Sequence, residues 1–196
     1  MDYKKLMIRG ISYSQTQSGA YALLLEDEET SVKLPVVIGN FEAQSISLGL
    51  EPDIKPPRPL THDLFTSFVN SANYTLESVI IYQIVDGVFF SNINFRSNES
   101  GEELILDART SDAVAMAVRF TAPIYTTAQV LNEAGILLEI EPAEHTVEEP
   151  EEEQDNYSKM SLEELKSLLD QAVRDEDYDA ALELQEEIKK RNRKID

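Results

Sequence analysis

Apolar and polar residues alternate along much of the first 110 positions, a pattern typical of β-strands that bury one face. Between two of these runs, Asp86-Gly87 suits the positive φ angles of a tight hairpin. Pro35 lies within another run and, because proline cannot donate to a strand ladder, it indicates an edge strand or a bulge. The expected strands are residues 4–13, 20–27, 32–38, 75–85, 88–95, 104–108 and 136–140.

Apolar residues at helical spacing interrupt these strands. Helices are expected after Asn40, Thr61 and Thr110, with those three residues as N-caps, and a short fourth helix over residues 127–134. Hairpins mixed with separated helices indicate an α+β domain with a mixed or antiparallel β-sheet and three to four helices, rather than alternating βαβ units.

The composition changes after residue 140. Residues 141–155 hold eight acidic residues and no basic ones, and such a run repels itself instead of forming a core. We therefore expect a domain over residues 1–140, a flexible acidic linker over 141–157 and a separate element over 158–196. In that element Ser161 and Glu164 have capping-box spacing, and two amphipathic helices predict a C-terminal α-helical hairpin.

The net charge of -20 is shared by both parts, with 9 basic and 18 acidic residues in 1–140 and 8 and 19 in 141–196. An acidic surface opposes nonspecific binding of phosphates, which depends on Lys and Arg. The absence of cysteine excludes disulfides and zinc–thiolate sites. No segment approaches the roughly 18 consecutive apolar residues of a membrane span, and the start is not secretory. We expect a soluble cytoplasmic protein with no membrane role.

Two polar segments stand at helix starts. One is Arg58-Pro59-Leu60-Thr61-His62-Asp63 and the other Asp107-Ala108-Arg109-Thr110-Ser111-Asp112. Histidine exchanges protons near neutral pH, and His62 is one of only two histidines. The acids Glu42, Asp63 and Asp112 each follow an expected N-cap by two positions. They have a structural explanation in the helix dipole and a functional one in binding Mg²⁺ or Mn²⁺ beside a phosphate.

Four blocks, in order along the chain, resemble the bifunctional nuclease domain family of bacteria and plants over about residues 5–140. They are Leu34-Pro35-Val36-Val37-Ile38-Gly39 with Glu42-Ala43, the two segments above with Ala113 added to the second, and Ala122-Pro123-Ile124-Tyr125. One departure is Thr110, where the family usually has proline. Threonine does not pre-set φ, which leaves this loop less rigid.

The resemblance implies a nuclease that hydrolyses phosphodiester bonds of DNA and RNA. The expected catalytic residues are His62, as general acid or base, with Glu42, Asp63, Asp107 and Asp112. Mg²⁺ or Mn²⁺, held by Asp63, Asp107 and Asp112, is expected to activate water. Arg58 and Arg109 are expected to hold phosphate oxygens, and Thr61 and Ser111 complete the substrate-binding candidates.

A second hypothesis is a noncatalytic regulatory or small-anion-binding protein. On that hypothesis Arg58, Asp63, Asp107 and Arg109 form a buried ion-pair network that needs no substrate. Nucleotides, phosphate and divalent ions would then give no specific thermal stabilisation.

The C-terminal hairpin, from about Leu162 to Arg193, is similar to the UVR motif, named for the bacterial excision-repair subunits that pair through it. Helices of roughly 14 residues are marginal alone in water, so their apolar faces must pack on something. We expect a protein partner or self-association, and hence a homo-oligomer; the alternative is a hairpin docked on the main domain.

Overall fold

The computed structural model describes residues 3–13, 20–51, 53–137, 160–175 and 177–192. Contacts divide the chain into two units. The first consists of Met1–Leu50 and Pro59–Leu138, and the second of Glu51–Arg58 and Glu139–Asp196. The expected linker over 141–157 lies outside the described residues.

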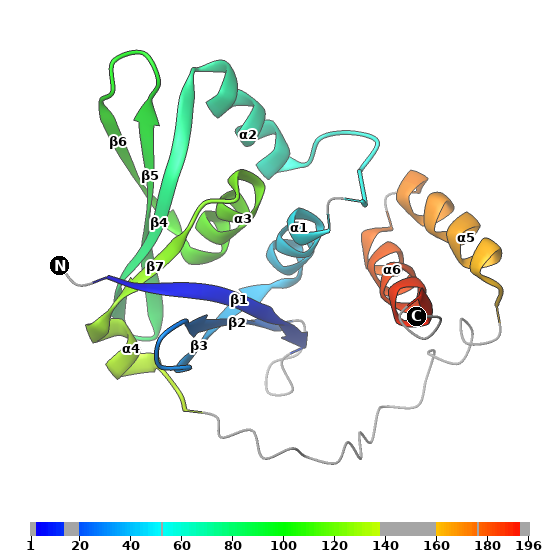
Figure 1. Cartoon of the computed structure of the whole chain (residues 1–196), viewed down its shortest axis with the longest axis horizontal. Helices are drawn as coiled ribbons and strands as arrows, with labels where there is room; N and C mark the ends of the chain where they lie inside the picture. Colours follow the sequence, from blue (N-terminus) through cyan, green and yellow to red (C-terminus); the bar gives the residue numbers. More distant parts are fainter. Residues whose placement is uncertain (1–2, 14–19, 52, 138–159, 176, 193–196) are drawn as a thin grey trace. The chain divides into compact units, whose positions relative to one another are not determined.

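The first unit is built on a seven-stranded sheet of order β3-β2-β1-β7-β4-β5-β6 (Figure 1). Neighbouring strands are antiparallel except β4 and β7, which are parallel. The predicted α+β class with a mixed sheet is therefore confirmed. The strands are β1 (Tyr3–Tyr13), β2 (Ala20–Asp27), β3 (Lys33–Gly39), β4 (Tyr74–Val85), β5 (Val88–Ser97), β6 (Glu103–Arg109) and β7 (Ile124–Thr127).

Two local predictions about these strands are confirmed. Pro35 lies on β3, which is an edge strand of the sheet, where a missing backbone donor is tolerated. Asp86 and Gly87 have φ angles of 50° and 78° and connect β4 to β5 as the two-residue turn of a hairpin.

The end of the first unit differs from the sequence prediction. Residues 124–127 form β7, which the apolar pattern did not predict. In the strand expected over 136–140, Ile136 forms an isolated bridge with Lys33, and residues 138–140 lie outside the described part of the chain.

Four helices of the first unit are α1 (Asn40–Leu50), α2 (Thr61–Ser71), α3 (Thr110–Phe120) and α4 (Ala128–Ala134). Helix α3 packs against both α1 and α2 and against the strands β4, β5 and β6 (Figure 1). The close approach of α1 and α3 depends on Gly49, because a Cβ there would lie 2.5 Å from a methyl group of Val118. The core between helices and sheet contains Ile46, Val79, Ile81, Phe95 and Val114 among its buried side chains.

The N-caps of two helices are displaced by one residue from the prediction. Thr61 and Thr110 are the first residues of α2 and α3, and their N-caps are Leu60 and Arg109. The Thr110 hydroxyl has turned inward and lies 2.7 Å from the Ser91 hydroxyl on β5, where both residues are buried. This bond ties the start of α3 to the sheet.

The second unit contains the predicted helical hairpin, formed by α5 (Leu162–Arg174) and α6 (Tyr178–Asn192). Its buried side chains include Leu165, Leu184 and Ile188. The Ser161 capping box is confirmed, because Ser161 Oγ accepts from the Glu164 amide and the Glu164 carboxylate accepts from the Ser161 amide. Within the described ranges, the helices are all too short or too polar to cross a membrane.

Candidate functional site

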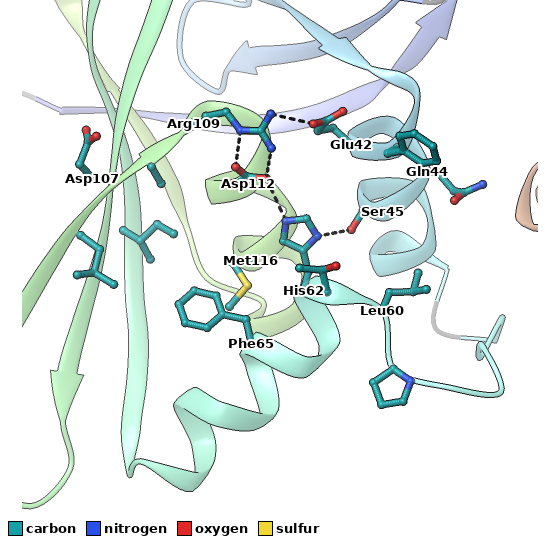
Figure 2. A pocket seen from close by; sticks show the side chains of 16 residues that line it. Glu42, Gln44, Ser45, Leu60, His62, Phe65, Asp107, Arg109, Asp112 and Met116 are labelled. Carbon is teal, nitrogen blue, oxygen red and sulfur yellow. Dashed lines mark hydrogen bonds and ion pairs between the residues drawn. The ribbon is translucent and has the colours of Figure 1, made fainter.

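A cleft of about 830 Å³ lies in the first unit, lined by α1, α2, α3, β5, β6 and the segment before α2 (Figure 2). It takes residues from three of the four blocks that the sequence singled out. Its polar lining is Glu42, Gln44, Ser45, Thr61, His62, Asp107, Arg109 and Asp112, and its apolar lining is Phe41, Pro59, Leu60, Phe65, Ile93, Leu106, Ala108 and Met116.

His62 is held at both ring nitrogens by residues of two other helices. Its Nδ1 lies 2.8 Å from Ser45 Oγ on α1, and its Nε2 lies 3.2 Å from Asp112 Oδ1 on α3 (Figure 2). A carboxylate only accepts hydrogen bonds, so Nε2 carries the proton and donates to Asp112. In the neutral ring Nδ1 then accepts from the Ser45 hydroxyl. The basic nitrogen of His62 therefore faces a hydroxyl that lines the cleft.

Arg109 joins the two carboxylates at the polar end of the cleft. Its Nε and Nη2 donate to the two oxygens of Asp112 at 2.7 and 3.0 Å, and its Nη1 donates to Glu42 at 2.9 Å. The hydrogen bonds to Asp112 raise the pKa of Arg109 above its usual value, and Glu42 adds to this effect, so the guanidinium stays charged. An arginine has five N–H groups. These three bonds leave two of them, and the side chain is 68% exposed.

Local backbone geometry places Glu42 beside this arginine. Gly39 ends β3 immediately before α1, and a Cβ at Gly39 would lie 2.5 Å from the Glu42 carboxylate. The missing side chain of Gly39 thus leaves room for the Glu42 carboxylate to lie over the N-terminus of α1. The anion also lies in the first turn of α1, where the helix dipole favours it.

Asp63 is placed differently from its neighbour His62. Its Oδ2 accepts from the Leu60 amide at 2.9 Å, which caps α2, and its Oδ1 pairs with Arg119 at 2.7 Å. The Arg119 side chain is only 8% exposed, and it also donates to the backbone carbonyls of Ser45 and Ala115. Asp63 does not line the cleft and stabilises the junction of the three helices.

The other predicted site residues divide into two groups. Asp107 and Thr61 line the cleft and are exposed, and the Tyr82 hydroxyl lies 3.5 Å from Asp107. Ser111 is buried and does not line the cleft, and Arg58 is exposed and does not line it either. The structure therefore brings together His62, Glu42, Asp107, Asp112, Arg109 and Thr61 from the predicted set, and not Asp63, Arg58 or Ser111.

The predicted metal ligands do not converge. Asp63 pairs with Arg119, and Asp112 is bound by Arg109. In the described residues no three His, Asp or Glu side chains are arranged to hold a metal ion. The donor set as placed does not fit Mg²⁺ or Mn²⁺, because Arg109 already lies between Glu42 and Asp112. A requirement for either ion stays a prediction.

The predicted buried network of Arg58, Asp63, Asp107 and Arg109 is not the one that forms. Arg109 pairs with Glu42 and Asp112, and Asp63 pairs with Arg119. Sequence reasoning missed Ser45 and Arg119, the two residues that complete these sets. Neither stands in a polar block, so the only available signal was the polar character of Ser45 on an apolar helix face.

Comparison with known proteins agrees with the four blocks. The model of the bifunctional nuclease domain matches residues 23–139, which include every lining residue of the cleft. Two uncharacterised proteins, from two strains of Mycobacterium tuberculosis, are each 35% identical to the chain over 134 residues, covering 68% of it and 77% of the relative.

Proposed function

The chain belongs to the bifunctional nuclease domain family, and we propose that it hydrolyses phosphodiester bonds of DNA or RNA in the cleft around His62. Membership suggests a nuclease-like function associated with nucleic acid. The observation that supports the proposal most directly is the convergence of three separated blocks, represented by Glu42 on α1, His62 on α2, and Arg109 and Asp112 at the β6–α3 junction. Ser45 on α1 joins them from outside the blocks.

The hydrogen bonds of His62 suggest a route for the proton. As water attacks phosphorus, Ser45 Oγ accepts a proton from that water and passes its own proton to His62 Nδ1. The resulting imidazolium is stabilised by Asp112 at Nε2. The same proton is then available for the oxygen that leaves. In this route Ser45 and His62 act together as the general base, and Asp112 orients the ring.

Arg109 is the group that stabilises negative charge on the phosphate. Its two remaining N–H groups suit two phosphate oxygens, and its bonds to Glu42 and Asp112 fix the plane of the guanidinium. Those carboxylates also offset its charge, which lowers its attraction for phosphate. We therefore expect slow hydrolysis that weakens further as salt is added.

The family resemblance implies that the activity depends on Mg²⁺ or Mn²⁺, and we keep this dependence as an expectation. The proton route described above requires no metal ion. Loss of activity in a chelator, with recovery on adding Mg²⁺, would support it.

The alternative function is binding of a small anion without hydrolysis. It is favoured by one observation: the chain of contacts Glu42–Arg109–Asp112–His62–Ser45 is complete without any substrate. In that case His62 is a structural connector between α1 and α3, and its removal changes stability alone.

The test is an assay of the purified full chain on labelled single-stranded DNA and RNA, with Mg²⁺ and with chelator. We expect His62→Ala to reduce kcat by about 10²- to 10⁴-fold, the range of acid–base catalysis, and Arg109→Met to reduce it as well. Arg96→Met is the matched control, because Arg96 also pairs with two carboxylates, Glu77 and Glu103, outside the cleft. Equal activity of His62→Ala and the unmodified protein contradicts the proposal.

A further inference from the structure

The cleft has a polar end and an apolar end, separated by His62. Figure 2 shows Glu42 and Arg109 on one side of His62 and Phe65 and Met116 on the other. Pockets of roughly 300–1,000 Å³ lined by apolar groups with a few polar ones commonly bind small organic ligands. At about 830 Å³, this cleft is within that range. Its size and lining suit a ligand that has both a charged part and flat apolar parts.

Phe41 adds an exposed aromatic ring to the rim. It lies in the first turn of α1, lines the cleft and is 83% exposed, more than the other large apolar side chains in the described part of the chain. Exposing a phenylalanine to water has no structural benefit, and α1 is anchored by Ala43, Ile46 and Leu48 instead. An aromatic face of this kind stacks on an unpaired nucleobase whatever its identity.

The described cations of the first unit are all paired with a carboxylate or buried. Of its described Lys and Arg side chains, six pair with a carboxylate, and the seventh, Lys33, is buried at 6% exposure. The six pairs are Lys4–Glu29, Lys5–Glu28, Arg9–Glu26, Arg96–Glu77, Arg109–Asp112 and Arg119–Asp63.

This pairing restricts the kind of nucleic acid that suits the cleft. A long strand binds through many phosphates, each neutralised by a Lys or Arg that displaces counterions. Here Arg109 is the one Lys or Arg lining the cleft, and the carboxylates of Glu42, Asp107 and Asp112 line it as well. A strand that continued beyond the cleft over the described surface of this unit would meet cations that are paired or buried. The exposed Arg58, which directly precedes Pro59 of the lining but belongs to the second unit, is one further cation close to the cleft in sequence. Binding energy must come mainly from the bases.

We propose that the substrate is a short phosphodiester of dinucleotide size, with one or two phosphates at Arg109 and unpaired bases against Phe41 and the apolar end. This inference rests on the proposed nuclease function and narrows its substrate class. The proposal excludes a binding mode in which the protein contacts many successive phosphates of a long strand.

The first experiment compares lengths. The full chain is assayed on the dinucleoside monophosphates ApA and TpT and on single strands of about five and about twenty nucleotides, with kcat/KM expressed per scissile bond. We expect no rise with length, and a slope of log kcat/KM against log salt of about −0.7 or shallower, as for one phosphate contact on a single strand. A rise of about tenfold from dinucleotide to the longest strand, with a slope steeper than about −2, overturns the inference.

The second experiment measures binding by titration calorimetry with TpT and does not require turnover. We expect Phe41→Ala to weaken TpT binding by roughly tenfold, the scale of one base stacked on an aromatic ring, and Phe41→Leu to restore little of the loss. Leu64→Ala is the control, because Leu64 is 64% exposed but does not line the cleft. Both positions are exposed, so the variants retain the fold.

The outcomes separate the two proposals. Binding of TpT that depends on Phe41, without hydrolysis of any substrate, supports the small ligand and contradicts the nuclease. Hydrolysis that favours the longest strand supports the nuclease and contradicts the small ligand. Absence of TpT binding contradicts the small ligand.

Discussion

Ser45 Oγ lies 2.8 Å from Nδ1 of His62, so a hydroxyl in the middle of α1 fixes the imidazole ring of a residue at the start of α2. Ser45 is buried, and its hydroxyl is hydrogen-bonded to Nδ1 of the ring. Asp112 is hydrogen-bonded to Nε2. The ring therefore has one orientation, because turning it over would place carbon atoms at both partners.

This contact predicts that Ser45→Ala reduces hydrolysis while leaving the fold intact. Because the hydroxyl passes the proton from water to His62, we expect its removal to lower kcat by about 10²-fold, the lower end of the range for acid–base catalysis. The measurement is kcat beside the urea midpoint, with Ser67→Ala on α2 as control, because Ser67 bonds a helix carbonyl outside the cleft. Unchanged kcat in Ser45→Ala would remove the serine from the proton route.

Asp63 is predicted to act on stability rather than on chemistry. Arg119→Met removes a donor that the Asp63 carboxylate shares with two helix carbonyls, and breaking such a pair costs about 3 kcal/mol when the cation is buried. Asp63→Asn should lower the urea midpoint less, because Asp63 is one-third exposed.

The rate of hydrolysis per folded molecule also tests whether Asp63 has a structural role rather than a catalytic one. At a temperature where it remains folded, Asp63→Asn should hydrolyse at close to the unmodified rate, whereas Asp112→Asn should not. A large loss of kcat in folded Asp63→Asn would return this residue to the catalytic set.

The buried contact between Ser91 and Thr110 predicts a non-additive pair of substitutions. Thr110→Val and Ser91→Ala each leave a buried hydroxyl unpaired, which costs about 1–3 kcal/mol. The double variant removes both hydroxyls and should be less destabilised than the sum of the single variants. Urea unfolding of the four proteins gives the coupling energy, and strict additivity would show that the two hydroxyls do not interact.

Glu26 predicts a pH-dependent contribution to stability. The hydrogen bond from Arg9 lowers the pKa of Glu26 below its usual value in the folded protein. The stabilisation is thus present above the unfolded-state pKa and is lost as pH falls through the lower folded-state pKa. Glu26→Gln should lower the urea midpoint near neutral pH, and the difference should shrink as the medium is acidified below the usual pKa of a glutamate. A difference that grows on acidification would contradict this.

The regular elements were predictable because local pattern and tertiary burial agree in them. Asp86-Gly87 specifies its hairpin through backbone geometry alone, and the buried residues Ser91, Ile93 and Phe95 alternate along β5 as a strand pattern requires. β7 was missed because its four residues, Ile124–Thr127, are too few to show an alternating apolar pattern. Thr126 is fully buried, since its hydroxyl donates to the Ile81 carbonyl on β4. That acceptor lies 45 residues away, so no local pattern indicates it.

The candidate site was predictable in its blocks but not in its pairings. His62 and Asp63 are adjacent in sequence, and adjacency suggested a shared role. Neighbouring positions on a helix do not face each other, however, and the two side chains point to different partners. Ser45 reaches His62 because α1 packs closely in the fold, where Gly49 lets α1 approach α3. Neither Ser45 nor Gly49 belongs to a polar block of the sequence. Contacts of this kind depend on tertiary structure, which composition and spacing do not encode.

The position of β7 has a consequence for biosynthesis. In the sheet that the structure describes, β7 alone bonds the strands β3-β2-β1 to the strands β4-β5-β6, yet it is the last of the seven to leave the ribosome. Glu42 and Ser45 lie on α1, which follows the strands β1, β2 and β3, whereas His62 lies on α2, before β4, and Asp112 on α3, after β6. A polypeptide released before residue 124 lacks the strand that joins the two groups of strands, so we expect a prematurely terminated chain not to assemble the cleft.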